Sequence, residues 1–265
     1  MTRDDNVTGT IASGQFATFE LVDQVAFVRL QRPDRLNAAS AELVADFKHA
    51  LDQAVASPAV VTVISGEGRA FCAGHDLKAD ALPPESDEAR EHLHTLQGIT
   101  RLLRDSAMMS IAAVHGYALG AGLEFALSCD FIVAEEGTTF GFPEVSVGLS
   151  VTGGISFLLP QAVGLPMAKE LILLGDRFGA EKALSLGLIN RVAAPGDHLR
   201  VAEELAGRLV ALHHHALSLA KESFESALRP QVETAMALEI ENALLTGDSA
   251  DAGDARNEFA AKGQQ

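Results

Sequence analysis

Two glutamates lie in long stretches that carry no other formal charge. Glu124 is the only charged residue between Asp105 and Asp130, and Glu144 precedes an uncharged stretch that runs to Ala168. Carboxylates are rarely buried without a partner or a chemical task. Two buried carboxylates in apolar surroundings can have raised and separated pKa values, which suits general acid–base catalysis. The alternative is that each is a hydrogen-bonded structural carboxylate, and the residues alone leave both interpretations open.

Two glycine-containing segments, residues 66–78 and 115–124, each follow a predicted strand. Glycine lets a chain turn tightly, and the N–H groups at the start of a helix stabilise an anion or a developing oxyanion. The alternatives are an ordinary strand-to-helix loop for the first segment and close helix packing for the second. The second segment also nearly matches the dinucleotide-binding pattern, but Phe125 replaces its third glycine. A nicotinamide-dependent dehydrogenase is therefore a further alternative, which a failure to bind NAD would exclude.

Other catalytic chemistries find little support in the sequence. The three histidines at 213–215 would point in different directions on a helix, and no HExxH motif or acidic cluster accompanies them. Cys72 could act as a nucleophile, but the sequence identifies no histidine with an Asn or Asp partner for it. We therefore expect no metal ion and no cofactor.

The composition limits the partners and the compartment. The chain has 20 basic and 36 acidic residues, a net charge of −16, which argues against binding to nucleic acids or to anionic membranes. Two cysteines and no secretory or transit signal in residues 1–15 indicate a reducing compartment, the cytoplasm. Residues 106–123 and 145–168 are uncharged, but their glycines and prolines are typical of buried strand–loop–helix units, not of a membrane helix.

The elements that must position these residues alternate in the first half of the chain. Hydrophobic periodicity predicts strands at residues 19–30 (with a turn at 23–24), 60–64, 110–114 and 131–133. It also predicts a helix at 41–57, a second helix that ends at about residue 104 and a third that begins at about residue 119. Ser40 is the expected N-cap of the helix at 41–57. From residue 153 onward helices dominate, with expected breaks at Pro160, Pro166 and Gly187.

This alternation predicts an α/β fold with a helical C-terminal region. We expect a disordered N-terminal tail at residues 1–15, a core at 16–195 that binds the substrate, and a helical region at 196–265. The prolines at 83–84 predict a mobile loop.

Several segments, taken in order, resemble the crotonase superfamily, the enoyl-CoA hydratase/isomerase family. The matching segments are Arg32–Pro33 with Leu36–Ala38, Ala70–Leu77, Gly116–Glu124, Cys129–Asp130, Phe140–Glu144, Leu174–Phe178 and Gly187–Val192. Each motif alone is modest, but their joint order and spacing are specific. The resemblance covers residues 16–262.

The resemblance implies a crotonase-like spiral of ββα units, followed by a helical region that builds homotrimers, often paired into hexamers. It also implies an acyl-CoA thioester as substrate and an oxyanion hole, made of two backbone N–H groups, for the thioester enolate. These donors fall on His75 and Ala121, where the family often has glycine at the second position. Arg35 and Lys78 are the expected contacts of the CoA phosphates.

The reaction implied is that of an enoyl-CoA hydratase, a lyase that adds water across the 2,3 double bond to give 3-hydroxyacyl-CoA. Glu124 and Glu144 would together orient one water, with Glu144 as the main acid/base at C2 and Glu124 as the water-orienting partner. The residues expected to line the substrate site are Arg35, Asn37, Ala38, Ala73, Asp76, Leu77, Lys78, Gly122, Phe142 and Thr152.

Two departures from the family pattern keep other reactions open. Phe142 stands where several hydratases carry glutamine, and Thr152 introduces a hydroxyl that is expected near Glu144. Both changes could alter the substrate or the reaction. Double-bond isomerisation, thioester hydrolysis, C–C cleavage and non-catalytic acyl-CoA binding therefore remain alternatives.

Overall fold

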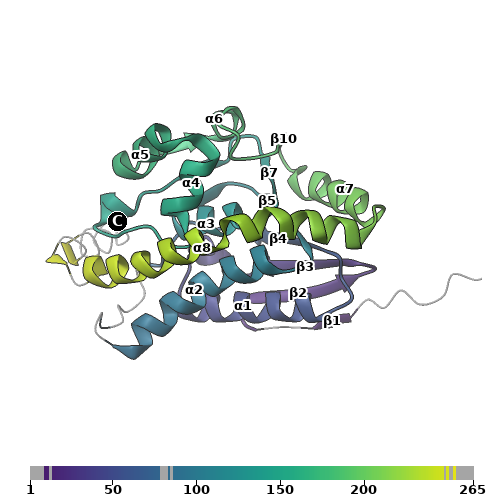
Figure 1. Cartoon of the computed structure of the whole chain (residues 1–265), viewed down its shortest axis with the longest axis horizontal. Coiled ribbons are helices and arrows are strands. Elements are labelled where there is room, and N and C mark those ends of the chain that lie inside the picture. Colours follow the sequence, from purple (N-terminus) through teal and green to yellow (C-terminus); the bar gives the residue numbers. More distant parts are fainter. Residues whose placement is uncertain are drawn as a thin grey trace, which may run out of the picture.

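The computed structural model describes residues 9–11, 14–77, 83, 86–247, 249–250 and 253–254, and a seven-stranded sheet forms its centre (Figure 1). The strand order is β1-β2-β3-β4-β5-β7-β10. Three strands pair in antiparallel fashion: β1 (Gly9–Ile11), β2 (Ala17–Val22) and β3 (Val25–Leu30). The others continue the sheet parallel to β3: β4 (Val61–Gly66), β5 (Met109–Val114), β7 (Phe131–Glu135) and β10 (Arg191–Ala193). The chain thus has the predicted α/β architecture.

Side chains alternate between two buried faces of this sheet, because successive residues of a strand point to opposite sides. On β4, Val61 and Val63 pack against α7 (His198–Val210), whereas Ile64 belongs to the larger core on the other face. The larger core also contains the apolar faces of α1 (Ala41–Ala56) and α2 (Asp87–Asp105). Ser40 caps α1 as predicted, accepting a hydrogen bond from the N–H of Leu43.

The boundary expected at residue 196 does not separate two packing units. Helix α7 follows that position, yet its buried residues Ala202, Leu205 and Leu209 complete the second core of the central sheet. The sheet would expose an apolar face without this helix, so α7 belongs to the core. A second correction concerns the N-terminus, because residues 9–11, inside the tail predicted to be disordered, form β1.

A smaller three-stranded sheet was not predicted. It consists of β6 (Tyr117–Leu119), β8 (Thr139–Gly141) and β9 (Phe178–Gly179). Short helical elements follow these strands, namely α3 (Ala121–Leu127), the 3-10 helix η2 (Glu144–Val147) and α6 (Ala180–Ser185), and a further 3-10 helix, η1, spans Pro33–Arg35. The glutamates singled out in the sequence therefore lie just beyond two strands that pair with each other, β6 and β8.

The remaining helices lie outside the smaller sheet. They are α4 (Ile155–Val163), α5 (Leu165–Leu174) and α8 (His214–Gly247), and α8 runs across the front of the molecule over α2 and α4 (Figure 1). The break expected at Pro160 is wrong: α4 continues through this residue and ends at Val163, before Gly164 with φ +78°. The loop expected at residues 83–84 lies almost entirely outside the described residues.

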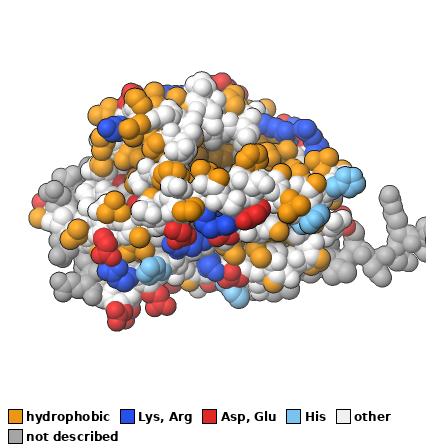
Figure 2. Space-filling view, in the orientation of Figure 1, with side chains coloured by type: hydrophobic (Ala, Val, Ile, Leu, Met, Phe, Trp, Pro, Cys, Tyr) orange, Lys and Arg blue, Asp and Glu red, His pale blue; other side chains and the backbone are white. Residues whose placement is uncertain are grey.

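The visible surface divides into a charged and an apolar part. Figure 2 shows charged side chains in a band over α2 and α8, and hydrophobic side chains over the upper part, where α4 and α5 lie. Leu165, Leu173 and Leu174 on α5 are well exposed. Within the described residues, no helix combines the length and hydrophobicity that crossing a bilayer requires.

Candidate active site

The backbone at the start of α3 and the segment around His75 approach each other closely. Gly74 has φ +97°, and a Cβ atom there would lie 2.9 Å from the carbonyl oxygen of Leu119. Gly120 has φ +50° and precedes Ala121, the first residue of α3. As the first helical residue, Ala121 has an N–H group that cannot bond within the helix. The two predicted oxyanion donors therefore follow two glycines whose backbones are in contact.

Hydrogen bonds fix the segment that carries His75 on both sides. The N–H of Cys72 donates to Tyr117 O (3.0 Å), and the N–H of Leu119 donates to Cys72 O (3.1 Å). On the other side, the N–H of Ala39 donates to Gly74 O (2.8 Å). This pairing places His75 between the strand β6 and the segment that follows η1.

The side chains of Asn37 and Asp76 stabilise the segment around His75 through hydrogen bonds and an ion pair. Asn37 is fully buried with φ +54°, and its amide donates to the carbonyls of Glu67 and Ala70 at 2.9 and 2.8 Å. Asp76 is buried and forms an ion pair with Arg32, whose guanidinium also donates to Ala38 O. Both residues were predicted to line the substrate site; in the structure their side chains position the loop, and a contact with substrate stays a prediction.

Glu124 is held as a fully hydrogen-bonded carboxylate in the first turn of α3. Its side chain is only 1% exposed, and both of its oxygens accept hydrogen bonds from Thr152. The N–H of Thr152 donates to Oε1 at 2.7 Å, and its hydroxyl donates to Oε2 at 2.6 Å. Burial raises the pKa of Glu124, and these two hydrogen bonds act in the opposite direction. The hydroxyl of Thr152, which was expected in the region of Glu144, donates its hydrogen bond to the neighbouring Glu124.

A double-glycine turn explains why Thr152 reaches Glu124. Gly153 and Gly154 both have positive φ, +68° and +80°, which folds the segment back on itself. A Cβ atom on Gly153 would lie 3.3 Å from Glu124 Oε2. The turn therefore presses the backbone of residues 152–153 against the carboxylate.

Glu144 lies nearby in a different environment. Glu144 begins η2 directly after Pro143, and it is buried. Its Oε1 lies 2.6 Å from the position that a Cβ atom on Gly120 would occupy. Its Oε2 is buried and has no hydrogen-bond partner among the described residues. Burial and, next, the charge of Glu124 raise the pKa of Glu144. The two carboxylates thus differ: one is satisfied by protein donors, and the other has an oxygen available for a ligand.

The other predicted substrate contacts occupy varied positions. Arg35 is exposed, whereas Ala38, Ala73 and Leu77 are half-buried around the His75 segment. Gly122 allows α3 to pack directly on Cys72, since a Cβ atom there would lie 2.2 Å from Cys72 O. Phe142 is fully buried in the main core, so it can affect the shape of the site only through core packing. Lys78 lies outside the described residues.

Two alternatives raised by the sequence find no support in this geometry. Burial raises the pKa of the Cys72 thiol to about 12, so the residue is not a thiolate nucleophile at neutral pH. Among the residues that the structure describes, no three His, Cys, Asp or Glu side chains are grouped to hold a metal ion.

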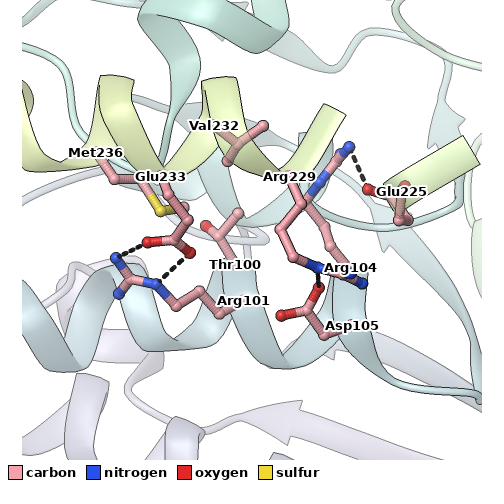
Figure 3. Close-up of a pocket in the computed structure, with 9 residues that line it drawn as sticks. All are labelled: Thr100, Arg101, Arg104, Asp105, Glu225, Arg229, Val232, Glu233 and Met236. Atoms are coloured by element: carbon pink, nitrogen blue, oxygen red, sulfur yellow. Dashed lines mark hydrogen bonds and ion pairs between the residues drawn. The ribbon is translucent and has the colours of Figure 1, made fainter. Parts of the chain in front are cut away.

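A small pocket between α2 and α8 is distinct from this site (Figure 3). Ion pairs that join the two helices line it, among them Arg101 with Glu233 and Arg104 with Glu225. Its charges are compensated within the pocket, and none of the predicted site residues lines it. We interpret it as a packing gap between two helices.

Sequence reasoning missed one acidic residue close to the site. Glu239 on α8 is 2% exposed and accepts hydrogen bonds from the N–H groups of Gly154 and Ser156. Glu239 lies in a long helix that contains both polar and apolar residues. Nothing in the local sequence indicates which tertiary contact this glutamate makes.

Comparison with known proteins gives a consistent result. A family model described as enoyl-CoA hydratase/isomerase matches residues 20–265. A crotonyl-CoA hydratase of Syntrophomonas wolfei subsp. wolfei is 33% identical over 224 residues, which cover 84% of this chain and 86% of the relative. A 4-chlorobenzoyl coenzyme A dehalogenase of Arthrobacter sp. is 31% identical, covering 88% and 86%. The crystal structure of an enoyl-CoA hydratase from Mycobacterium avium subsp. paratuberculosis has a TM-score of 0.85 at 25% identity, covering 94% of this chain and 97% of that one.

Proposed function

Since this chain belongs to the enoyl-CoA hydratase/isomerase family, we propose that it is an enoyl-CoA hydratase, which adds water across the 2,3 double bond of a 2-enoyl-CoA thioester to give 3-hydroxyacyl-CoA. One observation carries the proposal. Both oxygens of Glu124 are occupied by Thr152, whereas the buried Oε2 of the neighbouring Glu144 has no partner among the described residues. Two carboxylates in different protonation states are what an addition of water needs, because one must accept a proton while the other donates one.

The N–H groups of His75 and Ala121 would bind the thioester oxygen. When the water oxygen bonds to C3, the electrons of the double bond move through C2 toward the thioester, and negative charge develops on its oxygen. An oxyanion donor of this type contributes about 3–4 kcal/mol to lowering the barrier. The close contact of Gly74 and Gly120 supports this role, since it brings the two donor segments together.

The two glutamates would divide the proton transfers. Glu124, which Thr152 stabilises as a carboxylate, accepts a proton from the attacking water. Glu144, whose pKa is raised by burial and by the charge of Glu124, holds a proton and delivers it to C2. The water thus supplies OH to C3, Glu144 supplies H to C2, and the proton on Glu124 returns to Glu144 through solvent. No cofactor is required, because coenzyme A is part of the substrate.

The test follows the loss of enoyl-thioester ultraviolet absorbance with short and medium 2-enoyl-CoA substrates. We expect the wild type to consume them, and Glu124→Gln and Glu144→Gln each to lower kcat by about 10²–10⁴-fold. Glu203→Gln, which changes an exposed glutamate on α7, serves as the control and should stay within about twofold of the wild type. Binding of an acyl-CoA without any loss of absorbance would contradict the proposal.

The same assay separates the alternatives. A 3-enoyl-CoA probe detects an isomerase, release of free thiol detects a hydrolase, and 4-chlorobenzoyl-CoA tests the activity for which one relative is named. A non-catalytic binder would bind acyl-CoA, show no turnover and be indifferent to Glu144→Gln. We further propose that the protein works in the cytoplasm, which its free thiols at Cys72 and Cys129 suit.

A further inference from the structure

Glu239 is a buried carboxylate that the mechanism above does not use. It lies on α8, and its Oε2 accepts a hydrogen bond from the N–H of Gly154 at 2.7 Å, while Oε1 accepts one from the N–H of Ser156 at 2.8 Å. These donors belong to the beginning of α4, where Gly154 occupies the N-cap position and has no side chain to cap the helix. Glu239 therefore supplies, from a distant helix, the cap that the local sequence lacks.

The same part of α8 also packs against the double-glycine turn. A Cβ atom on Gly154 would lie 3.1 Å from Val232 and 3.4 Å from Met236. Gln97 on α2 donates to Met236 O at 2.9 Å, which fixes this stretch of α8 on the molecule. The turn is thus held between α8 on one side and Glu124 on the other.

We propose that Glu239 is a positioning residue for Glu124: by binding the N–H groups of Gly154 and Ser156, it holds the turn at the position from which Thr152 donates both hydrogen bonds to the Glu124 carboxylate. Only the kinetic test of this inference rests on the proposed hydratase function. The chain of contacts is continuous, from Glu239 to Gly154, through Thr152, to both oxygens of Glu124. Mispositioning a catalytic group by about 1 Å can cost up to about 100-fold in rate.

The decisive variant is Glu239→Gln, because glutamine keeps the size but replaces one acceptor oxygen with an NH₂ group that cannot accept from these N–H groups. The matched control is Glu225→Gln, which removes a half-buried carboxylate from the same helix and breaks its pair with Arg104 without touching the turn. Glu239→Asp, which keeps the charge but shortens the reach, is the second variant should Glu239→Gln not fold.

We expect Glu239→Gln to lower kcat about tenfold with KM changed less than twofold, and Glu225→Gln to leave kcat within twofold. Thr152→Val should also lower kcat, and the double variant should fall little further than Thr152→Val alone, because both changes disrupt one chain of contacts. Equal kcat in the wild type and Glu239→Gln, or a double variant whose losses multiply, would overturn the proposal.

A second readout does not depend on turnover. Amide hydrogen exchange in residues 151–156 should be faster in Glu239→Gln than in the wild type or in Glu225→Gln. A wild type that hydrates no enoyl-CoA would refute the proposed function while leaving this measurement valid. Unchanged exchange in Glu239→Gln would refute the positioning role whatever the activity.

Discussion

The difference between Glu124 and Glu144 arises from a few neighbouring atoms. Two donors from Thr152 stabilise the charge on Glu124, and that charge then disfavours ionisation of Glu144. The side chain of Phe142, two residues before Glu144, has no polar atom that could compensate. Burial and the charge of Glu124 thus both favour the protonated form of Glu144, which the proposed reaction needs.

The raised pKa of Glu144 has a consequence for stability. Below pH 4.5, the ordinary value, folded and unfolded states both hold the proton; as the pH rises, the unfolded state releases it first. The contribution of Glu144 to stability is therefore lost as the pH rises through its raised pKa. Glutamine carries no such proton, so we expect Glu144→Gln to be stabilised over the wild type by roughly 2–4 kcal/mol at pH 9, and by far less at pH 5.

Thermal unfolding midpoints of both proteins between pH 5 and 9 measure this effect. The wild type at pH 5 is the internal reference, because there the two side chains are closest in charge. A difference in midpoint that stays constant with pH would contradict a raised pKa for Glu144.

The elements of the site depend on a backbone conformation that excludes a side chain at Gly120. This residue has φ +50° and ψ −125°, and Oε1 of Glu144 lies 2.6 Å from the position that its Cβ atom would occupy. We expect Gly120→Ala to lower the free energy of unfolding by about 1–3 kcal/mol through backbone strain. It should also reduce kcat at least about 100-fold, because the new Cβ atom displaces Glu144.

Gly207→Ala is the matched control, since Gly207 lies within α7 and nothing surrounds its missing Cβ within 4 Å. Alanine there should stabilise the protein by about 0.5–1 kcal/mol and leave kcat unchanged. Urea denaturation and steady-state kinetics on both variants give the comparison. Equal kcat for Gly120→Ala and the wild type would argue against this arrangement of the site.

Periodic elements were predictable, and the contacts that join them were not. The strands at 25–30, 61–66 and 109–114 carry buried apolar runs, and Ser40 marks the start of α1, so local pattern located them. Strands β6, β8 and β9 are two or three residues long, which is too short for any period to show. The site glutamates were predictable as isolated charges, but Thr152 pairs with Glu124 across 28 residues, and only the folded backbone shows this.

At the scale of the whole molecule, the exposed apolar side chains bear on assembly. Phe224 on α8 is 72% exposed, and Leu173 and Leu174 on α5 are more than half exposed. Exposed apolar surface of this kind is typical of contacts between subunits. Together with the family resemblance, it leads us to propose a homotrimer or a dimer of trimers.

Sedimentation equilibrium should therefore give a mass of three or six chains of 27.9 kDa. Replacing both Leu173 and Leu174 with aspartate should lower the association state if α5 contributes to the interface. A monomer at micromolar concentration would contradict the proposal, whereas the pair of glutamates could still act within one chain.

The contact between Glu239 and Gly154 spans 85 residues of sequence, so it can form only late in the synthesis of the chain. A ribosome adds about 5–20 residues per second and releases the N-terminal part first. The sheet, Glu124, Glu144 and the glycine turn all precede α8 in the chain. At this rate, Glu239 is synthesised several seconds after Gly154, the residue of the turn whose N–H it binds. A message truncated between the codons for Ser156 and His214 would therefore encode both glutamates and the turn, but not Glu239.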